Sequence, residues 1–324
     1  MKIIKTVALA AAFLAGVATS ALAKYPERPI TLIVPWAAGG GTDAVARALA
    51  AQMEKELGTP VNVVNRTGGA GVIGHTEIVN ARPDGYTIGL ATAELGTYYW
   101  SATAPFTYEQ VTPIALVNLD ASAFNVAANS KWTDLRAALD DIKAAPKGTY
   151  KLSGMGPGAG YHLALSGLLH SEGIDPSKVT VVPSQGAAPG FQELASGGVQ
   201  LVPSSLPEAK SMIDAGQVKT LAVLADKRLN AFPAVPTVEE AIGKPWVGGT
   251  WRGIVGPKGL PQDVASTLEE AVKKAWDSKE YQQFMADRGF GVIYRNSADF
   301  SMFLAEQHKG NGEIMKLLGL RQRN

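Results

Sequence analysis

The chain has 324 residues, and its 30 Lys and Arg against 29 Asp and Glu give a formal net charge of +1. This balance argues against a nucleic-acid-binding surface and against a polybasic membrane patch. Because the chain has no cysteine, it cannot rely on disulfides or on a cysteine zinc site. Its stability must come from hydrophobic cores, and the length allows two domains.

The N-terminus has the pattern of an export signal. Lys2 and Lys5 precede an apolar stretch over residues 7–17, and the sequence ALA, ending at Ala23, forms a small-residue cleavage site. We expect residues 1–23 to be a signal peptide that is cleaved after Ala23. The alternative is a retained anchor helix, but the apolar stretch is too short to span a bilayer. Since no cysteine follows for lipid attachment, the pattern predicts a free periplasmic protein.

Short apolar runs alternate with helical patterns through the first third of the chain. This alternation predicts β-α-β units with parallel strands. The expected strands are 30–34, 61–65, 87–91 and 115–119, the expected helices are 43–57 and 72–81, and residues 94–104 are expected to be irregular.

The middle third contains its own set of strands and helices. We expect strands over 123–127, 151–153, 179–183, 200–203 and 220–225, and helices over 135–144, 161–172, 189–195 and 206–215. Several prolines between Pro233 and Pro261 then indicate a loop-rich return. Three further helices are expected over 262–277, 279–288 and 297–309.

Glycine-rich turns recur after the expected strands. They cover residues 37–43, 65–74, 153–162 and 184–189, and each leads into an expected helix. Such a turn points bare backbone N–H groups and the positive end of a helix dipole at one spot, which suits an anion. Glycine can also serve only to make a tight turn. If the first and third turns face each other across a cleft, two helix N-termini converge on one anion.

The second of these turns raises the alternative of a dinucleotide-binding enzyme. Residues 69–74 match G-x-G-x-x-G after an expected strand, and Glu94 lies twenty residues beyond Gly74. The export signal argues against this alternative, and so does the position of the match in the second β-α turn.

A further alternative is a secreted hydrolase or lyase that acts on a small carboxylate through His162 and Glu94. The chain has no G-x-S-x-G motif, and Ser153 with His162 lacks an assignable acid partner. The four histidines show no paired spacing for a metal ion. His162 could donate to an anion or tether its own loop. We therefore expect no catalytic residue, no metal site and no cofactor.

Several colinear motifs resemble the extracytoplasmic solute receptors of tripartite tricarboxylate transporters, the TctC or Bug family. They span the expected mature chain and read YPERPI at 25–30, VPWAAGGGTD at 34–43, VNR at 64–66, GGAG at 68–71, PDGYT at 83–87, GPGAGYH at 156–162, VP at 182–183, LASGGV at 194–199, LAV at 221–223, VPT at 235–237 and WRG at 251–253.

The resemblance implies an α/β fold of the two-domain periplasmic binding protein kind, a Venus flytrap that is type II-like. Each domain would be a mainly parallel sheet flanked by helices. Domain one would comprise residues 24–118 and 221–324, and domain two residues 119–220, with the ligand cleft between them. The chain would cross between the domains near 118–120 and 218–222.

The resemblance also implies which residues hold a ligand carboxylate. From domain one these are Trp36, Ala37, Ala38, Gly40, Thr42, Asp43, Thr92, Ala93 and Glu94. From domain two they are Ser153, Gly156, Gly158, Ala159 and His162, with Gln185, Ser204 and Ser205 placed to read the distal end of the ligand. Backbone N–H groups at a helix N-terminus can hold a carboxylate without arginine, which fits turns that contain almost no cations.

Some of these residues have two interpretations. Asp43 is expected to order the first turn, with Arg47 paired to it one helical turn later, rather than to contact ligand. Glu94 departs from the Ser or Thr of the family and would either favour a ligand with an amino or hydroxyl group or point away. Arg66 and Arg252 are either distal counterions or members of structural ion pairs.

The predicted function is that of a non-enzymatic receptor. It would capture a small organic carboxylate in the periplasm, such as a di- or tricarboxylate, and close over it by a hinge. Trp36 and Tyr161 would either form apolar walls over the ligand or pack their loops onto the core. The receptor would act as a monomer and deliver the ligand to the membrane components of a tripartite tricarboxylate transporter.

Overall fold

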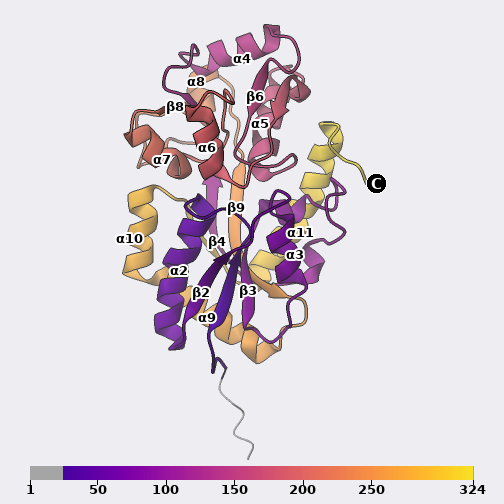
Figure 1. The fold of residues 1–324 in the computed structure, drawn as a ribbon, viewed down its shortest axis with the longest axis vertical. Coiled ribbons are helices and arrows are strands. Elements are labelled where there is room, and N and C mark those ends of the chain that lie inside the picture. The colour runs from indigo at the N-terminus through magenta and orange to yellow at the C-terminus, as the bar shows by residue number, and fades with distance from the viewer. Residues whose placement is uncertain (1–24, 324) are drawn as a thin grey trace, which may run out of the picture.

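The computed structural model describes residues 25–323, so the expected signal peptide and its cleavage after Ala23 lie outside the described residues. The chain forms two α/β domains, one above the other along the long axis of the molecule (Figure 1). Along the part of the chain that the structure describes, no helix is both long and apolar enough to cross a membrane.

The lower domain in Figure 1 is built on a six-stranded sheet with the order β10-β4-β9-β3-β1-β2. Its strands are β1 (Ile30–Val34), β2 (Val61–Asn65), β3 (Thr87–Thr92), β4 (Val111–Ala121), β9 (Gly249–Pro257) and β10 (Val292–Arg295). β1 pairs in parallel with β2 and β3, as expected. β9 runs antiparallel to β3 and β4, and β10 runs antiparallel to β4, so the sheet is mixed rather than mainly parallel.

Helices cover both faces of this sheet. On one face, α2 (Gly41–Leu57), α9 (Gln262–Asp277) and α10 (Lys279–Arg288) share a core with Leu32 and Val34 of β1. On the other face, α3 (Val72–Val79) and α11 (Ser297–Leu317) share a core with Ile33. Alternate residues of β1 thus face opposite layers, as strand geometry requires. Two short 3-10 helices, η1 (Ala93–Gly96) and η2 (Tyr108–Gln110), lie between β3 and β4.

The upper domain contains a second, smaller sheet. β5 (Ala123–Ala127) pairs antiparallel with β8 (Val218–Val223), and β6 (Tyr150–Leu152) pairs in parallel with β7 (Val179–Val181). Isolated bridges of Leu201 to Leu152 and of Val202 to Asn125 join the two pairs, where the sequence predicted a full strand. The helices are α4 (Leu135–Ala144), α5 (Gly160–Ser171), η3 (Pro176–Lys178), α6 (Ala187–Ala195), α7 (Leu206–Asp214) and α8 (Val238–Ile242).

The segment expected to be a loop-rich return contains the central strand β9. Almost every residue of β9 is buried, because helices cover both faces of the sheet. A strand buried on both faces shows no polar alternation. Gly249, Gly253 and Pro257 further weaken its strand pattern. For these reasons the sequence pattern did not reveal β9.

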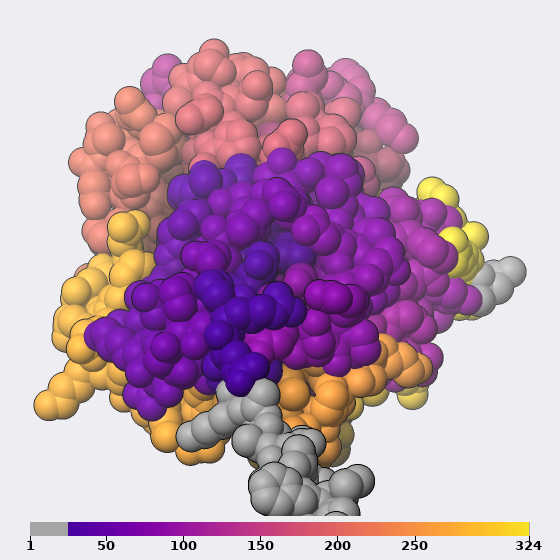
Figure 2. All heavy atoms as spheres, turned by 60° about the horizontal axis from the view of Figure 1, so that its bottom comes forward, coloured from indigo at the N-terminus to yellow at the C-terminus, as the bar shows by residue number. Residues whose placement is uncertain are grey.

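Residues 221–248 pack with the upper domain, whereas the sequence placed them in the lower one. β8 continues to Val223 and pairs with β5 along its length, and Leu224 and Val238 join the upper core. We therefore propose residues 25–121 with 249–323 as the lower domain and 122–248 as the upper domain. Figure 2 shows the lower domain from below, where indigo and purple residues from the start of the chain lie beside orange residues from its last third.

Candidate functional site

The first glycine-rich turn connects β1 to α2, and Asp43 holds it in place. Asp43 Oδ2 accepts from the Gly39 backbone N–H at 3.0 Å, and its Oδ1 accepts from the Asn65 side-chain amide at 3.0 Å. Arg47 pairs with the same carboxylate at 2.9 Å. Burial acts to raise the pKa of Asp43, but the hydrogen bonds from Arg47, Gly39 and Asn65 outweigh it and lower the pKa. These contacts match the expected ordering role, including the pairing with Arg47.

Glu94 lies in the cleft at the end of β3 as a buried carboxyl group. Its Oε2 accepts a hydrogen bond from the Thr92 hydroxyl, which in turn accepts from Trp36 Nε1 at 3.1 Å. Burial raises the pKa of Glu94, although Thr92, the Gly160 amide and Arg252 all favour the charged form. Position 94 thus places an acid, with an increased tendency to carry a proton, among the walls of the cleft.

The second glycine-rich turn supports the end of β3 through His75. His75 Nε2 accepts from the Thr92 backbone N–H at 3.2 Å, so its Nδ1 carries the proton and lies 2.9 Å from the Gly71 carbonyl oxygen. Burial lowers the pKa of His75 to about 4. No residue of the turn over 69–74 lines the cavity around Trp36 and Thr42. Gly69 and Ala70 instead line a second cavity, of about 340 Å³, whose opposite wall includes Gly158 of the upper domain.

In the third turn, His162 tethers its own loop. Its Nδ1 accepts from the Gly158 backbone N–H at 2.9 Å, and burial lowers the pKa of His162 to about 4. Within residues 25–323, no hydrogen bond joins His162 to Glu94, the pair that a hydrolase would need. The same part of the chain contains no group of three or more His, Asp or Glu residues placed to hold a metal ion.

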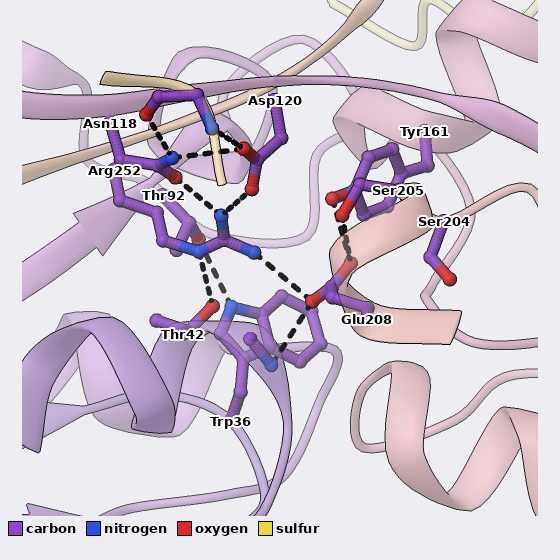
Figure 3. A network of polar contacts seen from close by, with 12 residues as sticks. Trp36, Thr42, Thr92, Asn118, Asp120, Tyr161, Ser204, Ser205, Glu208 and Arg252 are labelled. Carbon is purple, nitrogen blue, oxygen red and sulfur yellow. Dashed lines mark hydrogen bonds and ion pairs between the residues drawn. The ribbon is translucent and has the colours of Figure 1, made fainter. Parts of the chain in front are cut away.

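The centre of the site is Arg252, which lies on β9 and is 1% exposed. Its Nε donates to Thr42 Oγ1 at 3.0 Å, its Nη1 donates to Asn118 and Asp120, and its Nη2 donates to Glu208 at 3.0 Å (Figure 3). Burial acts to lower the pKa of Arg252, but Glu208, Tyr161 and Asp120 raise it, so the guanidinium stays charged. Of the two arginines with open roles, Arg252 thus reaches the cleft, whereas Arg66 forms an exposed pair with Glu77.

Glu208 joins the two domains across the cleft. It lies in the first turn of α7 in the upper domain, and its carboxylate accepts from Gly41 N–H at the start of α2 at 3.2 Å. The Tyr161 hydroxyl donates to the same carboxylate at 2.7 Å, and the Ser205 hydroxyl does so at 3.3 Å. Sequence reasoning missed Glu208, because a Ser followed three residues later by Glu reads as an ordinary helix start.

The cavity between the domains has a volume of about 30 Å³, which is space for a water-sized molecule, so a ligand must separate its walls. Six of the expected residues line it, namely Trp36, Ala37, Gly40, Thr42, Thr92 and Glu94. The cavity is also lined by residues that were not expected as ligand contacts, namely Gly41, Gly154, Met155, Gly186, Ala187, Glu208 and Thr250. Tyr161 and Arg252, for which ligand contact was one of two interpretations, line it as well.

The remaining expected residues lie elsewhere. Ala38, Ser153 and Gln185 line an adjoining open groove of about 720 Å³. Gly158 and Ala159 line another cavity of about 340 Å³, beside the C-terminal end of α11. Asp43, Ala93, Gly156, His162, Ser204 and Ser205 line none of these three spaces. His162 and Ser205 instead contact residues that do line them, Gly158 and Glu208. Asp43 orders the first turn from behind.

Comparison with known proteins identifies related sequences and structures. The family model described as "Tripartite tricarboxylate transporter family receptor" matches residues 45–320. A Cupriavidus necator protein named "UPF0065 protein in gbd 5'region" is 32% identical over 302 residues, which cover 92% of this chain and 89% of the relative.

Solved structures show the same likeness. The periplasmic binding protein BugD is 31% identical with a TM-score of 0.83, over 92% of this chain and 100% of its own. MatC from Rhodopseudomonas palustris, solved with bound malate, is 27% identical with a TM-score of 0.81, over 90% of this chain and 99% of its own.

Proposed function

Because this chain belongs to the receptor family of tripartite tricarboxylate transporters, we propose that it captures a small organic carboxylate in the periplasm and delivers it to the membrane components of such a transporter. The family and its solved structures are periplasmic solute-binding receptors, not enzymes. The chain is accordingly a receptor, and the proposal assigns ligand binding to its cleft.

A single observation supports a carboxylate as the ligand. Four hydrogen-bond donors converge at the N-terminus of α2: Gly41 N–H, the Arg252 guanidinium, and the hydroxyls of Tyr161 and Ser205. Each of them already donates to a carboxylate, that of Glu208. Charge-assisted hydrogen bonds and a helix N-terminus both favour an anion at this point. The MatC relative, which binds malate, adds support from a family member.

Capture would follow the cycle of a Venus flytrap. The chain passes between the domains once from β4 to β5 and once from the upper domain into β9, and rotation about these two connections would open the cleft. A di- or tricarboxylate would bind between Trp36, Thr42 and Thr92 of the lower domain and Tyr161 of the upper domain. The receptor would act as a monomer, reach the periplasm after cleavage behind Ala23, and need no cofactor.

A thermal-shift screen tests this function. The mature protein is heated with malate, citrate, succinate, aspartate and nicotinate, and with a neutral sugar and a polyamine as controls. A true ligand at 100 times its dissociation constant stabilises the fold by about 2.7 kcal/mol. A shift with at least one carboxylate and none with the controls is expected. If the sugar or the polyamine raises the melting temperature and no carboxylate does, the proposed function is wrong.

A further inference from the structure

The carboxylate of Glu208 is held by donors from both domains. Gly41 N–H and Arg252 Nη2, both of the lower domain, donate to Oε1 at 3.2 and 3.0 Å. The hydroxyls of Tyr161 and Ser205, both of the upper domain, donate to Oε2 at 2.7 and 3.3 Å. The Glu208 side chain is 5% exposed. These donors form a carboxylate site across the cleft, and a side chain of the protein itself occupies it (Figure 3).

Glu208 does not serve its own helix in this position. In a capping box, the acid folds back onto the backbone N–H at the start of its own helix. The pair Thr237 and Glu240 forms both bonds of such a box in α8. In α7, Ser205 and Glu208 have the same spacing, but the Ser205 side chain makes no capping bond, and Glu208 reaches across to α2 instead. The opposite domain, rather than α7, therefore fixes the position of this carboxylate.

The charge balance of the site leads to the same conclusion. Asp120 already pairs with Arg252 and accepts from the Gly291 N–H. Glu208 thus brings a second carboxylate to one buried guanidinium. A ligand carboxylate at the start of α2 would meet Glu208 at close range in a site with little water to screen the repulsion. The ligand and Glu208 cannot both use the donors of Gly41 and Arg252.

We propose that Glu208 is a resident carboxylate that occupies the ligand's position, and that a ligand carboxylate binds by displacing it from Gly41 and Arg252. This inference rests on the proposed function. Because α7 belongs to the upper domain, opening of the cleft withdraws Glu208 together with Tyr161 and Ser205. The α2 N-terminus and Arg252 are then free to receive the ligand. Glu208 thereby holds the domains together and sets the affinity, since every ligand must compete with it.

Chemical rescue tests the resident role without knowledge of the natural ligand. In Glu208→Ala the donors lose their carboxylate, so added acetate should fill the site and raise the melting temperature. Sodium chloride at the same ionic strength should have a smaller effect. Glu172→Ala is the matched control, because the Glu172 side chain is 6% exposed and pairs with Arg136 and Lys244 inside the upper domain. An acetate response in Glu208→Ala no larger than in Glu172→Ala would overturn the inference.

Glu208→Gln provides a second test, and it keeps the side-chain volume if the alanine variant does not fold. The glutamine oxygen can accept from Gly41 and Arg252, but it carries no charge to repel a ligand. Calorimetric titration with the best carboxylate from the thermal-shift screen should give about tenfold tighter binding than in the wild type. Equal or weaker binding would overturn the inference, and weaker binding would show instead that Glu208 contacts the ligand directly.

The two proposals fail in different ways. If a carboxylate binds the wild type and Glu208→Gln equally well, the proposed function stands and the resident role of Glu208 falls. If acetate rescues Glu208→Ala but every larger carboxylate fails to bind either protein, the resident role stands and the proposed ligand class is wrong.

Discussion

Two buried histidines fix the backbone on either side of the cleft. His75 accepts from the Thr92 N–H in the lower domain, and His162 accepts from the Gly158 N–H in the upper domain. A protonated imidazole has no acceptor nitrogen, so both contacts require the neutral ring. Burial lowers both pKa values from 6.5 to about 4. The two residues therefore link the order of the cleft to pH.

The free energy of unfolding should fall as the pH decreases from 6.5 to about 4. In this window the histidines of the unfolded chain take up protons while those of the folded chain remain neutral. At about pH 4, each buried histidine lowers the free energy of unfolding by up to about 3 kcal/mol. In His162→Gln the glutamine oxygen can still accept from Gly158 but does not titrate, so urea unfolding across the window should show a shallower decline. His170 is exposed, so His170→Gln is the control. If the free energy of unfolding falls equally steeply with pH in His162→Gln and in the wild type, His162 is not a buried neutral histidine as described.

At the scale of single residues, the sequence predicts contacts within an element better than contacts between domains. Asp43 and Arg47 lie one helical turn apart, so their pairing follows from helix geometry. Arg252 was left with two open roles, and Glu208 was not identified, because these two residues pair with each other across 44 residues of sequence and from different domains. Burial that depends on tertiary packing leaves no local pattern at either position.

At the scale of elements, two glycines of α11 should respond in opposite ways to the same substitution. Nothing lies within 4 Å of a Cβ at Gly310, so Gly310→Ala should stabilise the protein by about 1 kcal/mol through helix propensity. A Cβ at Gly312 would lie 2.7 Å from the Trp100 ring. That ring stacks on His308 and donates to its carbonyl oxygen at 2.8 Å, so it cannot easily move.

Gly312→Ala should therefore destabilise the protein by roughly 1–3 kcal/mol. Denaturant unfolding of both variants, measured side by side, checks this prediction. If both substitutions change the stability in the same direction, the packing of α11 against Trp100 differs from the one described.

Most helices and the parallel strands of the fold were predictable from the sequence, because their patterns are local. The helices over 135–144, 262–277 and 279–288 begin and end at the expected residues. α11 extends to Leu317, beyond the expected end at 309, and Gly310 and Gly312 lie within it. β9 and β10 were missed, because their pairing with β4 depends on segments more than a hundred residues away.

At the scale of the whole molecule, the two domains differ in how the chain builds them. The upper domain uses one continuous segment, 122–248, with its own core. The lower domain needs both ends of the chain, because β9 lies between β3 and β4. The isolated fragment 122–248 should therefore melt cooperatively in circular dichroism, whereas the fragment 25–121 should not. A cooperative transition in 25–121 alone would contradict this interpretation of the sheet.

The position of β9 also has a consequence for the synthesis of the chain. A ribosome makes β3 and β4 well before it makes the strand that joins them, so the two strands cannot complete their sheet while the first 248 residues emerge. Arg252, which neutralises Asp120 and Glu208, arrives on that same late strand. The nascent lower domain thus lacks both its central strand and its buried cation until late in translation. A lower domain that cannot finish folding early stays open for longer, which would suit the export to the periplasm proposed above.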